Sequence, residues 1–340
     1  MVGHDIIVIG ASAGGVEALT KLVRDLPASL PAAIFIVLHL PVTAMSAMPQ
    51  ILNRAGKLKA IELKDKQLIK HGYIYVAPPN YHLLLRRGYI RLSQGPKENN
   101  HRPAIDPLFR TAARAYADRV VGVILSGTLD DGSAGLLAVK SRGGLAVVQN
   151  PKDALFSGMP ANAIKHVENV DYVLPLSEIA AVLVELAGEE VLGREDEPVS
   201  AEMEMECDAA EFDMSIMDSD DNPGVLSNLG CPSCGGTLWE QTNGNLLRFR
   251  CRIGHAWSED SLHAQQGEAL EEALWTALRA LEESASLSRR MAKRARERNQ
   301  ERMALNYENQ AGETQERAKV IRDVLLKNKG NGPIADEGVG

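Results

Sequence analysis

The first residues that could do chemistry form a serine-containing turn near the start of the chain. Residues 5–9 are an apolar run typical of a buried parallel strand, and Gly10-Ala11-Ser12-Ala13-Gly14-Gly15 follows directly. Apolar residues at helical spacing come next, so the segment predicts the strand, turn and helix of a G-x-S-x-G nucleophile elbow. The same turn could bind a phosphate, although Ser12 occupies the place of the second glycine in G-x-G-x-x-G. These residues alone leave both interpretations open.

A histidine and an aspartate follow two other predicted strands. His39 ends the run 33–38, and Asp130-Asp131-Gly132 comes after the run 120–125. Since the carboxyl ends of parallel strands meet at one edge of a sheet, Ser12, His39 and Asp131 are expected to lie together. A serine needs a base within hydrogen-bond distance, and that base needs an acceptor that fixes its tautomer. A lone histidine at a strand end is more often structural, and the order Ser–His–Asp differs from the Ser–Asp–His of α/β-hydrolases.

Four further residues have the spacing of a metal site. Cys231 and Cys234 form C-x2-C, and after sixteen residues Cys251 and His255 form C-x3-H. This spacing predicts a zinc-ribbon-like module in which four ligands hold a structural zinc. The alternative is a set of reduced thiols in a small β core. Cys207 lies outside the pattern and is expected to be a free thiol.

The elements that must position these residues alternate between strands and helices. Apolar runs at 33–38, 72–77, 120–125 and 145–148 are separated by helical patterns, which predicts an α/β fold, a doubly wound and mostly parallel sheet with helices on both faces. The segments 83–85 and 89–92 predict a hairpin that could add an antiparallel edge to the sheet.

The chain is expected to contain five regions. They are a catalytic region at 1–188, an acidic disordered linker at 189–224, the Cys/His module at 225–257, a helical region at 258–328, and a disordered tail at 329–340. Residues 189–221 carry a net charge of −13 in a chain of net charge −8. An acidic docking peptide is the alternative for this linker. The helical region fits either a hairpin of two helices or one long coiled-coil-like helix.

Composition places the chain among proteins without a membrane span. Its 340 residues contain no apolar run near the roughly 20 residues that a span needs. The first strand begins almost at once, so we expect no signal peptide and a cytoplasmic location. Arginines at 248, 250 and 252 hint at nucleic acid, but zinc ribbons serve more often as scaffolds.

Residues 5–183 resemble the catalytic domain of the chemotaxis protein-glutamate methylesterases. The resemblance rests on six blocks in the same order, at 9–15 (IGASAGG), 37–41 (VLHLP), 73–78 (YIYVAP), 101–103 (HRP), 122–132 (GVILSGTLDDG) and 157–160 (SGMP). It implies Ser12 as nucleophile, His39 as general base and Asp131 as the orienting carboxylate. The family's acid stands directly before a glycine, which leaves Asp130 as a supporting or solvated carboxylate.

The resemblance also implies a substrate and further site residues. His101 matches a histidine that lines the family's cleft, and the backbone near Thr128 and Gly14 is the candidate oxyanion hole. The expected reaction is hydrolysis of glutamate γ-methyl esters on a chemoreceptor or similar signalling protein, with glutamine deamidation by the same residues. Catalysis needs no metal or cofactor.

Two departures from the family pattern affect regulation and specificity. The family's usual form begins with a phosphoacceptor receiver domain, which this sequence lacks, so control through a receiver of its own is not expected. Ala13 and Thr128 stand where threonine and methionine are common, which changes the shape of the cleft.

Two alternatives to an active esterase are a catalytically degenerate scaffold that works through its C-terminal helices and a nucleotide-binding regulator. Those helices could also mediate self-association.

Overall fold

The catalytic region is built on a parallel sheet at whose edge the candidate residues gather. The computed structural model describes residues 3–39, 47–212 and 224–328, and the tail at 329–340 and part of the acidic segment lie outside them. Within these ranges the main sheet has seven strands in the order β3-β4-β2-β1-β7-β8-β9, all paired in parallel. They are β1 (Ile6–Ala11), β2 (Ala33–Leu38), β3 (Lys59–Glu62), β4 (Tyr73–Val76), β7 (Val120–Ile124), β8 (Leu145–Gln149) and β9 (Tyr172–Leu174).

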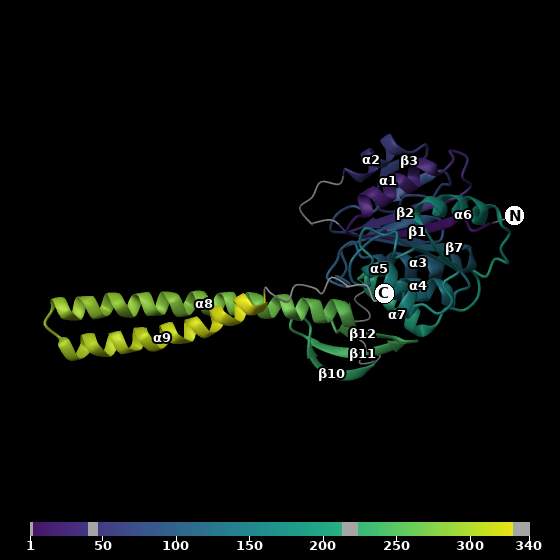
Figure 1. Cartoon of the computed structure of the whole chain (residues 1–340). Coiled ribbons are helices and arrows are strands. Elements are labelled where there is room, and N and C mark those ends of the chain that lie inside the picture. The colour runs from purple at the N-terminus through teal and green to yellow at the C-terminus, as the bar shows by residue number, and fades with distance from the viewer. Residues whose placement is uncertain (1–2, 40–46, 213–223, 329–340) are drawn as a thin grey trace, which may run out of the picture. The chain divides into compact units, whose positions relative to one another are not determined.

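Helices cover both faces of this sheet, as expected for a doubly wound fold (Figure 1). The apolar cluster on one face includes residues of α1 (Gly15–Asp25), α2 (Met48–Ala55) and α6 (Leu176–Gly188). The cluster on the other face includes residues of α3 (Ile105–Tyr116), α4 (Ser133–Ser141) and α5 (Gly158–His166). The three central strands β1, β2 and β7 are buried along their whole length, which explains their continuous apolar runs.

The predicted hairpin forms, but it does not extend the main sheet. Strands β5 (His82–Arg86) and β6 (Tyr89–Ser93) pair with each other as a separate antiparallel sheet. Leu83, Leu85 and Ile90 belong to the cluster that contains α3. Burial of this apolar face against the helix explains why the hairpin leaves the sheet edge.

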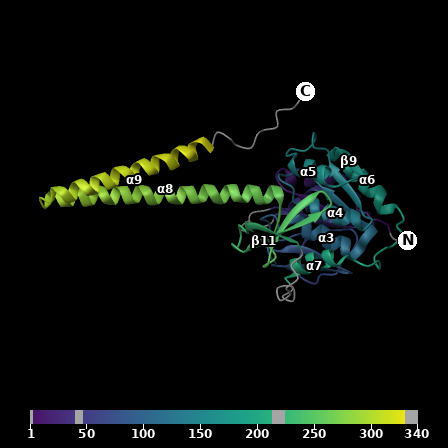
Figure 2. The same ribbon diagram turned by 90° about the horizontal axis from the view of Figure 1, so that it is seen from below.

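The acidic segment that the sequence predicted to be a disordered linker contains a helix, α7 (Ala201–Glu211). Ser200 caps it by accepting a hydrogen bond from the Met203 N–H. Helix α7 lies beside α3 (Figure 2) and buries Cys207, which is a free thiol. Its carboxylates pair with arginines far away in sequence, as Glu211 does with Arg114, so its charge is neutralised rather than solvated.

The Cys/His module is an antiparallel sheet that precedes a helical hairpin. Its strands are β10 (Val225–Gly230), β11 (Thr237–Asn243), β12 (Leu246–Cys251) and β13 (Ala256–Ser258). Trp257 is fully buried in a core that also contains Leu262 of the following helix. The chain divides into two compact units after Leu262, so this module belongs to the same unit as the catalytic region.

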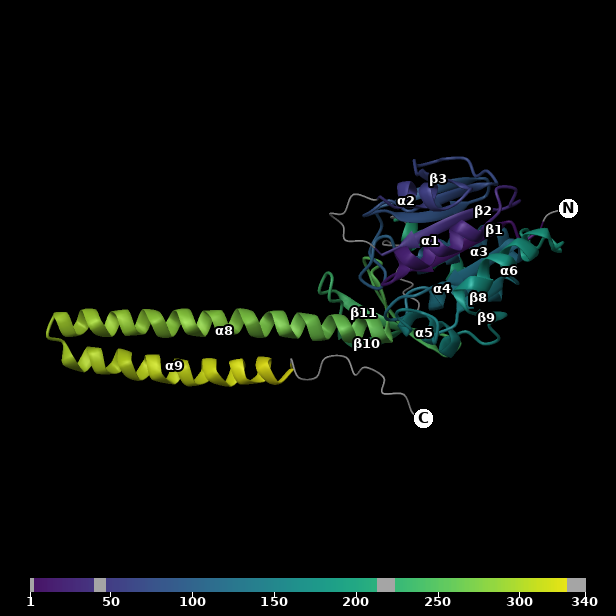
Figure 3. The ribbon, with the colours of Figure 1, turned by 45° about the horizontal axis from the view of Figure 1, so that its top comes forward.

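The second unit consists of two helices rather than one long helix. They are α8 (Glu259–Glu297), which begins in the first unit, and α9 (Glu301–Asn328), and the two run side by side (Figure 3). Small and apolar residues recur every seven positions and are buried, at Leu278, Ala285 and Ala292 of α8 and at Ala304, Ala311, Ala318 and Leu325 of α9. This period is the repeat of a coiled coil. None of the helices in the described part of the chain is long and apolar enough to cross a membrane.

Candidate active site and metal centre

Ser12, His39 and the Asp130-Asp131 pair all lie at the carboxyl ends of neighbouring central strands. Ser12 follows β1 and His39 follows β2, while Asp131 lies in the turn between β7 and α4. Strand order reverses in this region, since β2 lies on one side of β1 and β7 on the other. Open parallel sheets bind ligands at such a switch point.

The imidazole of His39 lies between the hydroxyl of Ser12 and the carboxylate of Asp131. Its Nδ1 is 3.2 Å from Ser12 Oγ, and its Nε2 is 2.7 Å from Asp131 Oδ2. An ionised carboxylate only accepts hydrogen bonds, so it favours the tautomer with the proton on Nε2. Nδ1 then has a lone pair directed at the serine hydroxyl, and this arrangement can accept the hydroxyl proton.

The carboxylate of Asp131 receives hydrogen bonds from several directions. The backbone N–H groups of Ile105 and Asp106, at the start of α3, donate to Oδ2 at 2.7 Å and to Oδ1 at 3.2 Å. Asn99 Nδ2 donates to Oδ1 at 3.0 Å. Burial alone would raise the pKa of Asp131, but the hydrogen bond and charge of His39 and the hydrogen bond from the Ile105 N–H hold that pKa below its usual range. Asp131 is thus a buried carboxylate that stays ionised.

A second buried carboxyl, Asp106, has the opposite environment. Burial and the neighbouring charge of Asp131 raise the pKa of Asp106 to about 8. Asn99 bridges the two groups, since its Nδ2 also donates to Asp106 Oδ2 at 2.9 Å. Like charges this close do not both ionise easily, so the pair has one ionised member at neutral pH.

The ring of His101 stacks on that of His39 at the carboxyl edge of the sheet. The two rings are nearly parallel, with centroids 3.7 Å apart. Burial and the nearby His39 lower the pKa of His101 to about 3. His101 is therefore neutral at physiological pH and leaves the charge at the site unchanged.

Gly14 and Thr128 lie on the two backbone turns that flank Ser12. Gly14 is the N-cap of α1 with φ 72°, a left-handed conformation that glycine adopts without strain. Thr128 is exposed and follows Gly127, at which an added Cβ would lie 2.9 Å from Ser12 Cβ. Both turns therefore bring backbone close to the serine.

Asp130 is buried rather than solvated. Its Oδ1 accepts a hydrogen bond of 2.6 Å from Ser258 Oγ of the Cys/His module. Burial raises the pKa of Asp130 to about 6, although the bond from Ser258 acts in the other direction. Asp130 has no hydrogen bond to Ser12 or His39 among the described residues.

Sequence reasoning missed Asn99 and Asp106, which both contact Asp131. The segment Glu98-Asn99-Asn100 stands directly before the His101-Arg102-Pro103 block, and its polar composition resembles that of an ordinary surface turn. Asn99 is only 3% exposed. The one signal in the sequence is that this polar segment directly precedes the 101–103 block. Its burial, which would have singled out Asn99, cannot be read from composition.

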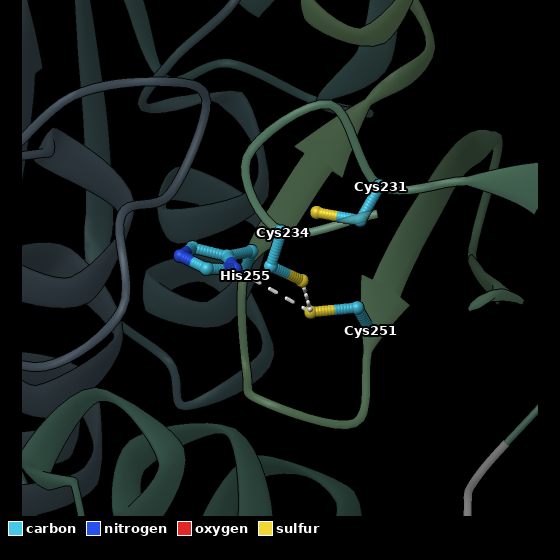
Figure 4. A group of neighbouring side chains, drawn as sticks. All are labelled: Cys231, Cys234, Cys251 and His255. Carbon is cyan, nitrogen blue, oxygen red and sulfur yellow. Dashed lines mark hydrogen bonds between the residues drawn. The ribbon is translucent and has the colours of Figure 1, made fainter. Parts of the chain in front are cut away.

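The predicted metal ligands converge at one end of the Cys/His module (Figure 4). The ligand atoms of Cys231, Cys234, Cys251 and His255 all lie within 4.8 Å of one another. Cys234 Sγ is 3.7 Å from Cys251 Sγ, which in turn is 3.5 Å from His255 Nδ1. A tetrahedral zinc with Zn–S bonds of about 2.3 Å separates two sulfurs by about 3.8 Å, and a sulfur and a nitrogen by about 3.5 Å. The donor set and its spacing are therefore compatible with a structural zinc.

The arginines of β12 are not presented to a nucleic acid. Arg248 and Arg250 are buried and pair with Glu98 and Glu206. These ion pairs connect β12 to Glu98 of the catalytic region and to Glu206 of α7.

Comparison with known proteins identifies similar chains over the catalytic region. A family model described as CheB methylesterase matches residues 7–183. A provisionally named protein-glutamate methylesterase/protein-glutamine glutaminase of Leptospira interrogans is 42% identical over 184 residues, which are 54% of this chain and 95% of that protein. A protein-glutamate methylesterase/protein-glutamine glutaminase of Hydrogenovibrio crunogenus is 37% identical over 187 residues, which span only 49% of its length.

The fold agrees with these sequence matches. The crystal structure of the Thermotoga maritima CheB methylesterase catalytic domain superposes with a TM-score of 0.52 at 34% identity, covering 54% of this chain and 98% of that one. The family model covers the region that contains the Ser12, His39 and Asp131 side chains, and its match ends before the acidic segment.

Proposed function

Because the chain belongs to the CheB methylesterase family, we propose that it is a protein-glutamate methylesterase acting on methylated chemoreceptors or related signalling proteins. The observation that carries this proposal is the His39 imidazole, held between the Ser12 hydroxyl and the Asp131 carboxylate inside the matched region. The same residues would deamidate glutamine side chains, since both relatives are also named protein-glutamine glutaminases.

In the first step Ser12 Oγ attacks the ester carbonyl carbon of a methylated glutamate. His39 Nδ1 accepts the hydroxyl proton as the new C–O bond forms, and the imidazolium is stabilised by Asp131 at Nε2. The proton then passes from Nδ1 to the methoxy oxygen, and methanol leaves. The product is an acyl-enzyme on Ser12.

In the second step water replaces methanol. His39 accepts a proton from the water, whose oxygen attacks the acyl carbon, and the proton returns to Ser12 Oγ. The free glutamate carboxylate is released. For a glutamine substrate the leaving group of the first step is ammonia, and the second step is the same.

The tetrahedral oxyanion of both steps needs hydrogen-bond donors close to Ser12. The backbone N–H groups of the turns at Gly14 and Thr128 are the candidates, and the positive end of the α1 dipole points to the same place. Loss of one such donor typically slows an acyl-transfer enzyme by about 10²–10³. His101 contributes a neutral surface against which the His39 ring is held parallel.

We propose in addition that the Cys3His cluster binds a structural zinc. Four ligands leave no open coordination position, so the metal would supply folding energy to the module and no step of the hydrolysis. Purified chain is expected to contain one zinc per molecule by elemental mass spectrometry. Cys251→Ala should lose the metal, whereas Cys207→Ala, a cysteine outside the cluster, should keep it. Equal zinc content in the two variants would contradict the assignment.

Methanol release from methylated chemoreceptor membranes tests the proposed activity. Ser12→Ala and His39→Ala should each abolish turnover, because one removes the nucleophile and the other the base. Matched controls are Ser141→Ala and His263→Ala, which change exposed residues elsewhere and should turn over at the wild-type rate. Turnover that survives in Ser12→Ala, or its absence in the wild type, would contradict the proposal.

A further inference from the structure

The Cys/His module pairs its last strand with the loop next to the catalytic acid. The Asn99 N–H donates to the Ala256 carbonyl at 2.8 Å, and the Ala256 N–H donates to the Lys97 carbonyl at 3.3 Å. Residues 97–99 thereby join β13 through a parallel bridge between Glu98 and Ala256. The same loop continues into His101, which stacks on His39.

The side chain of Asn99 connects this strand to the carboxylate. Its Oδ1 accepts from the Ser258 N–H at 2.9 Å and from Ser261 Oγ at 3.1 Å. Its Nδ2 donates to Asp131 and Asp106. The orientation of the amide is set by this network, because one end meets donors and the other meets carboxylates. Both polar groups of the Asn99 amide are thus hydrogen-bonded, the oxygen to residues 258 and 261 and the nitrogen to the carboxyl groups of Asp131 and Asp106.

A buried cluster of charges fixes the module against the catalytic region. Arg248 of β12 donates to Glu206 at 2.6 Å and to Glu98 at 3.2 Å, and Arg110 of α3 donates to Glu98 at 2.7 Å. The Arg110, Arg248, Glu98 and Glu206 side chains are each at most 4% exposed. Removing one partner of a buried pair leaves an uncompensated charge, so this cluster stabilises the contact between the folded module and the catalytic region.

The candidate metal ligands adjoin the strand that contacts Asn99. His255 directly precedes Ala256, and Cys251 and His255 enclose the turn that aligns β12 with β13. A module this small draws much of its folding energy from its metal. The position of β13, and with it the acceptor for the Asn99 N–H and the donor to its Oδ1, therefore depends on the Cys3His site.

We propose that Asn99 is a positioning residue through which the metal-loaded Cys/His module holds Asp131 in its working orientation, so that the metal state of the module controls turnover. The inference rests on the proposed function for its rate measurement. It assigns the module a role in the reaction, although the hydrogen bonds of the Ser12 and His39 side chains in the described structure are made within the catalytic region. Metal loss would withdraw β13, free the Asn99 amide and leave Asp131 without one of its donors.

Two variants of Asn99 separate positioning from folding. Asn99→Gly removes the side chain and suits the left-handed backbone at this position, where φ is 50°. Asn99→Asp keeps an acceptor for the Ser258 N–H but replaces the donor to Asp131 with an oxygen. Both should lower kcat by about 10- to 100-fold, the effect of losing one hydrogen bond to a charged group. KM should stay within about twofold, since a residue 3% exposed does not reach the substrate.

The pH profile adds a readout that a purely structural role would not move. The acid limb of kcat/KM follows protonation of the general base, His39. Without the Asn99 donor the negative charge of Asp131 stabilises the His39 imidazolium more strongly, so the acid limb should shift to higher pH in both variants. Asn245→Ala is the matched control, because this asparagine is exposed on the module and lies outside the network. Its profile should coincide with the wild type.

Metal removal from the full-length protein tests the coupling itself. Chelation should lower wild-type kcat by a factor similar to that of Asn99→Gly, and added Zn²⁺ should restore it. In Asn99→Gly, chelation should cause no further loss beyond about threefold, because two perturbations of one pathway are not additive. Amide hydrogen exchange of residues 97–101 should rise on chelation and fall again with Zn²⁺, independently of any activity.

Several results would overturn the inference. These are kcat of both Asn99 variants within threefold of wild type, additive losses on chelation of Asn99→Gly, or unchanged turnover and exchange in the chelated wild type. Acylation of Ser12 by p-nitrophenyl acetate, followed by mass spectrometry, separates this inference from the proposed function. If Ser12 is acylated but no methanol is released, the proposed methyl-ester substrate is wrong. The role of Asn99 is then tested by comparing the acylation rates of the wild type and the Asn99 variants. If Ser12 is not acylated at all, both proposals fail.

Discussion

Replacement of Asp131 by asparagine tests the proposed triad at the member whose side chain makes the most hydrogen bonds. The carboxylate accepts from His39 and Ile105 at Oδ2 and from Asn99 and Asp106 at Oδ1. An amide group has one oxygen, so in either orientation its NH2 faces two donors. Each lost hydrogen bond to a charged group is worth about 1.5–3 kcal/mol, which predicts a loss of roughly 3 kcal/mol or more in unfolding free energy.

The catalytic loss follows from the tautomer of His39. If the new NH2 occupies the Oδ2 position, it can donate to Nε2 only when the imidazole proton moves to Nδ1. That proton then points at Ser12, and the imidazole can no longer accept the hydroxyl proton. In a serine hydrolase the equivalent change lowers kcat by about 10⁴. We therefore expect a loss of about 10³–10⁴ in methanol release at pH 7.

Asp130→Asn is the control, because the two aspartates are adjacent in sequence. Asp130 accepts a bond from Ser258 Oγ, which an amide oxygen can also accept. Its kcat should fall by less than about tenfold, in line with the loss of one ordinary hydrogen bond. Steady-state methanol release and urea unfolding measure both effects. Equal losses in the two variants, or a larger loss in Asp130→Asn, would refute the assignment of Asp131.

Three further predictions concern stability. Gly132→Ala should lower the unfolding free energy in urea by about 2–4 kcal/mol, since φ is 101° and the new Cβ would lie 2.5 Å from Ile124 Cδ1; a change below 1 kcal/mol would contradict this. Asp130 has a folded pKa of about 6, above its unfolded value of about 3.9, so its contribution is complete below about pH 4 and is lost as pH rises through 6. Relative to Asp130→Asn, the unfolding free energy of the wild type should fall by roughly 2 kcal/mol between pH 4 and 7, and parallel pH profiles of urea unfolding in the two proteins would contradict this. Arg248→Met should cost about 3–5 kcal/mol because Glu206 and Glu98 lose a buried partner, and a wild-type melting curve would show the pairs to be dispensable.

Much of the candidate site could be predicted because it depends on local pattern. Ser12, His39 and Asp131 each follow a short apolar run, and parallel strands bring such positions to one edge of the sheet. The C-x2-C and C-x3-H spacing likewise predicted a cluster that the fold assembles. The apolar runs in the first case and the ligand spacing in the second indicate which residues come together, and the residue types then indicate the chemistry.

The rest depends on pairing between distant segments. Helix α7 was predicted to be disordered because its own residues are acidic. In the structure, however, its Glu206 is buried and forms ion pairs with Arg110, Arg248 and Arg250. Asn99 was missed for the same reason, since its partners are 32 residues away at Asp131 and 159 residues away at Ser258. No window of sequence contains both members of these pairs.

The buried charge cluster has a consequence for the making of the protein. Arg248 follows its partner Glu98 by 150 residues. At a synthesis rate of about 5–20 residues per second, Arg248 is added roughly 8–30 s after Glu98. During that time the Ser12 region can fold, but the loop that carries Asn99 still lacks its β13 partners, Ala256 and Ser258. By the role proposed for Asn99, the site is therefore complete only after β13 has been synthesised, and a chain truncated before β13 would lack the partners that orient the Asn99 amide.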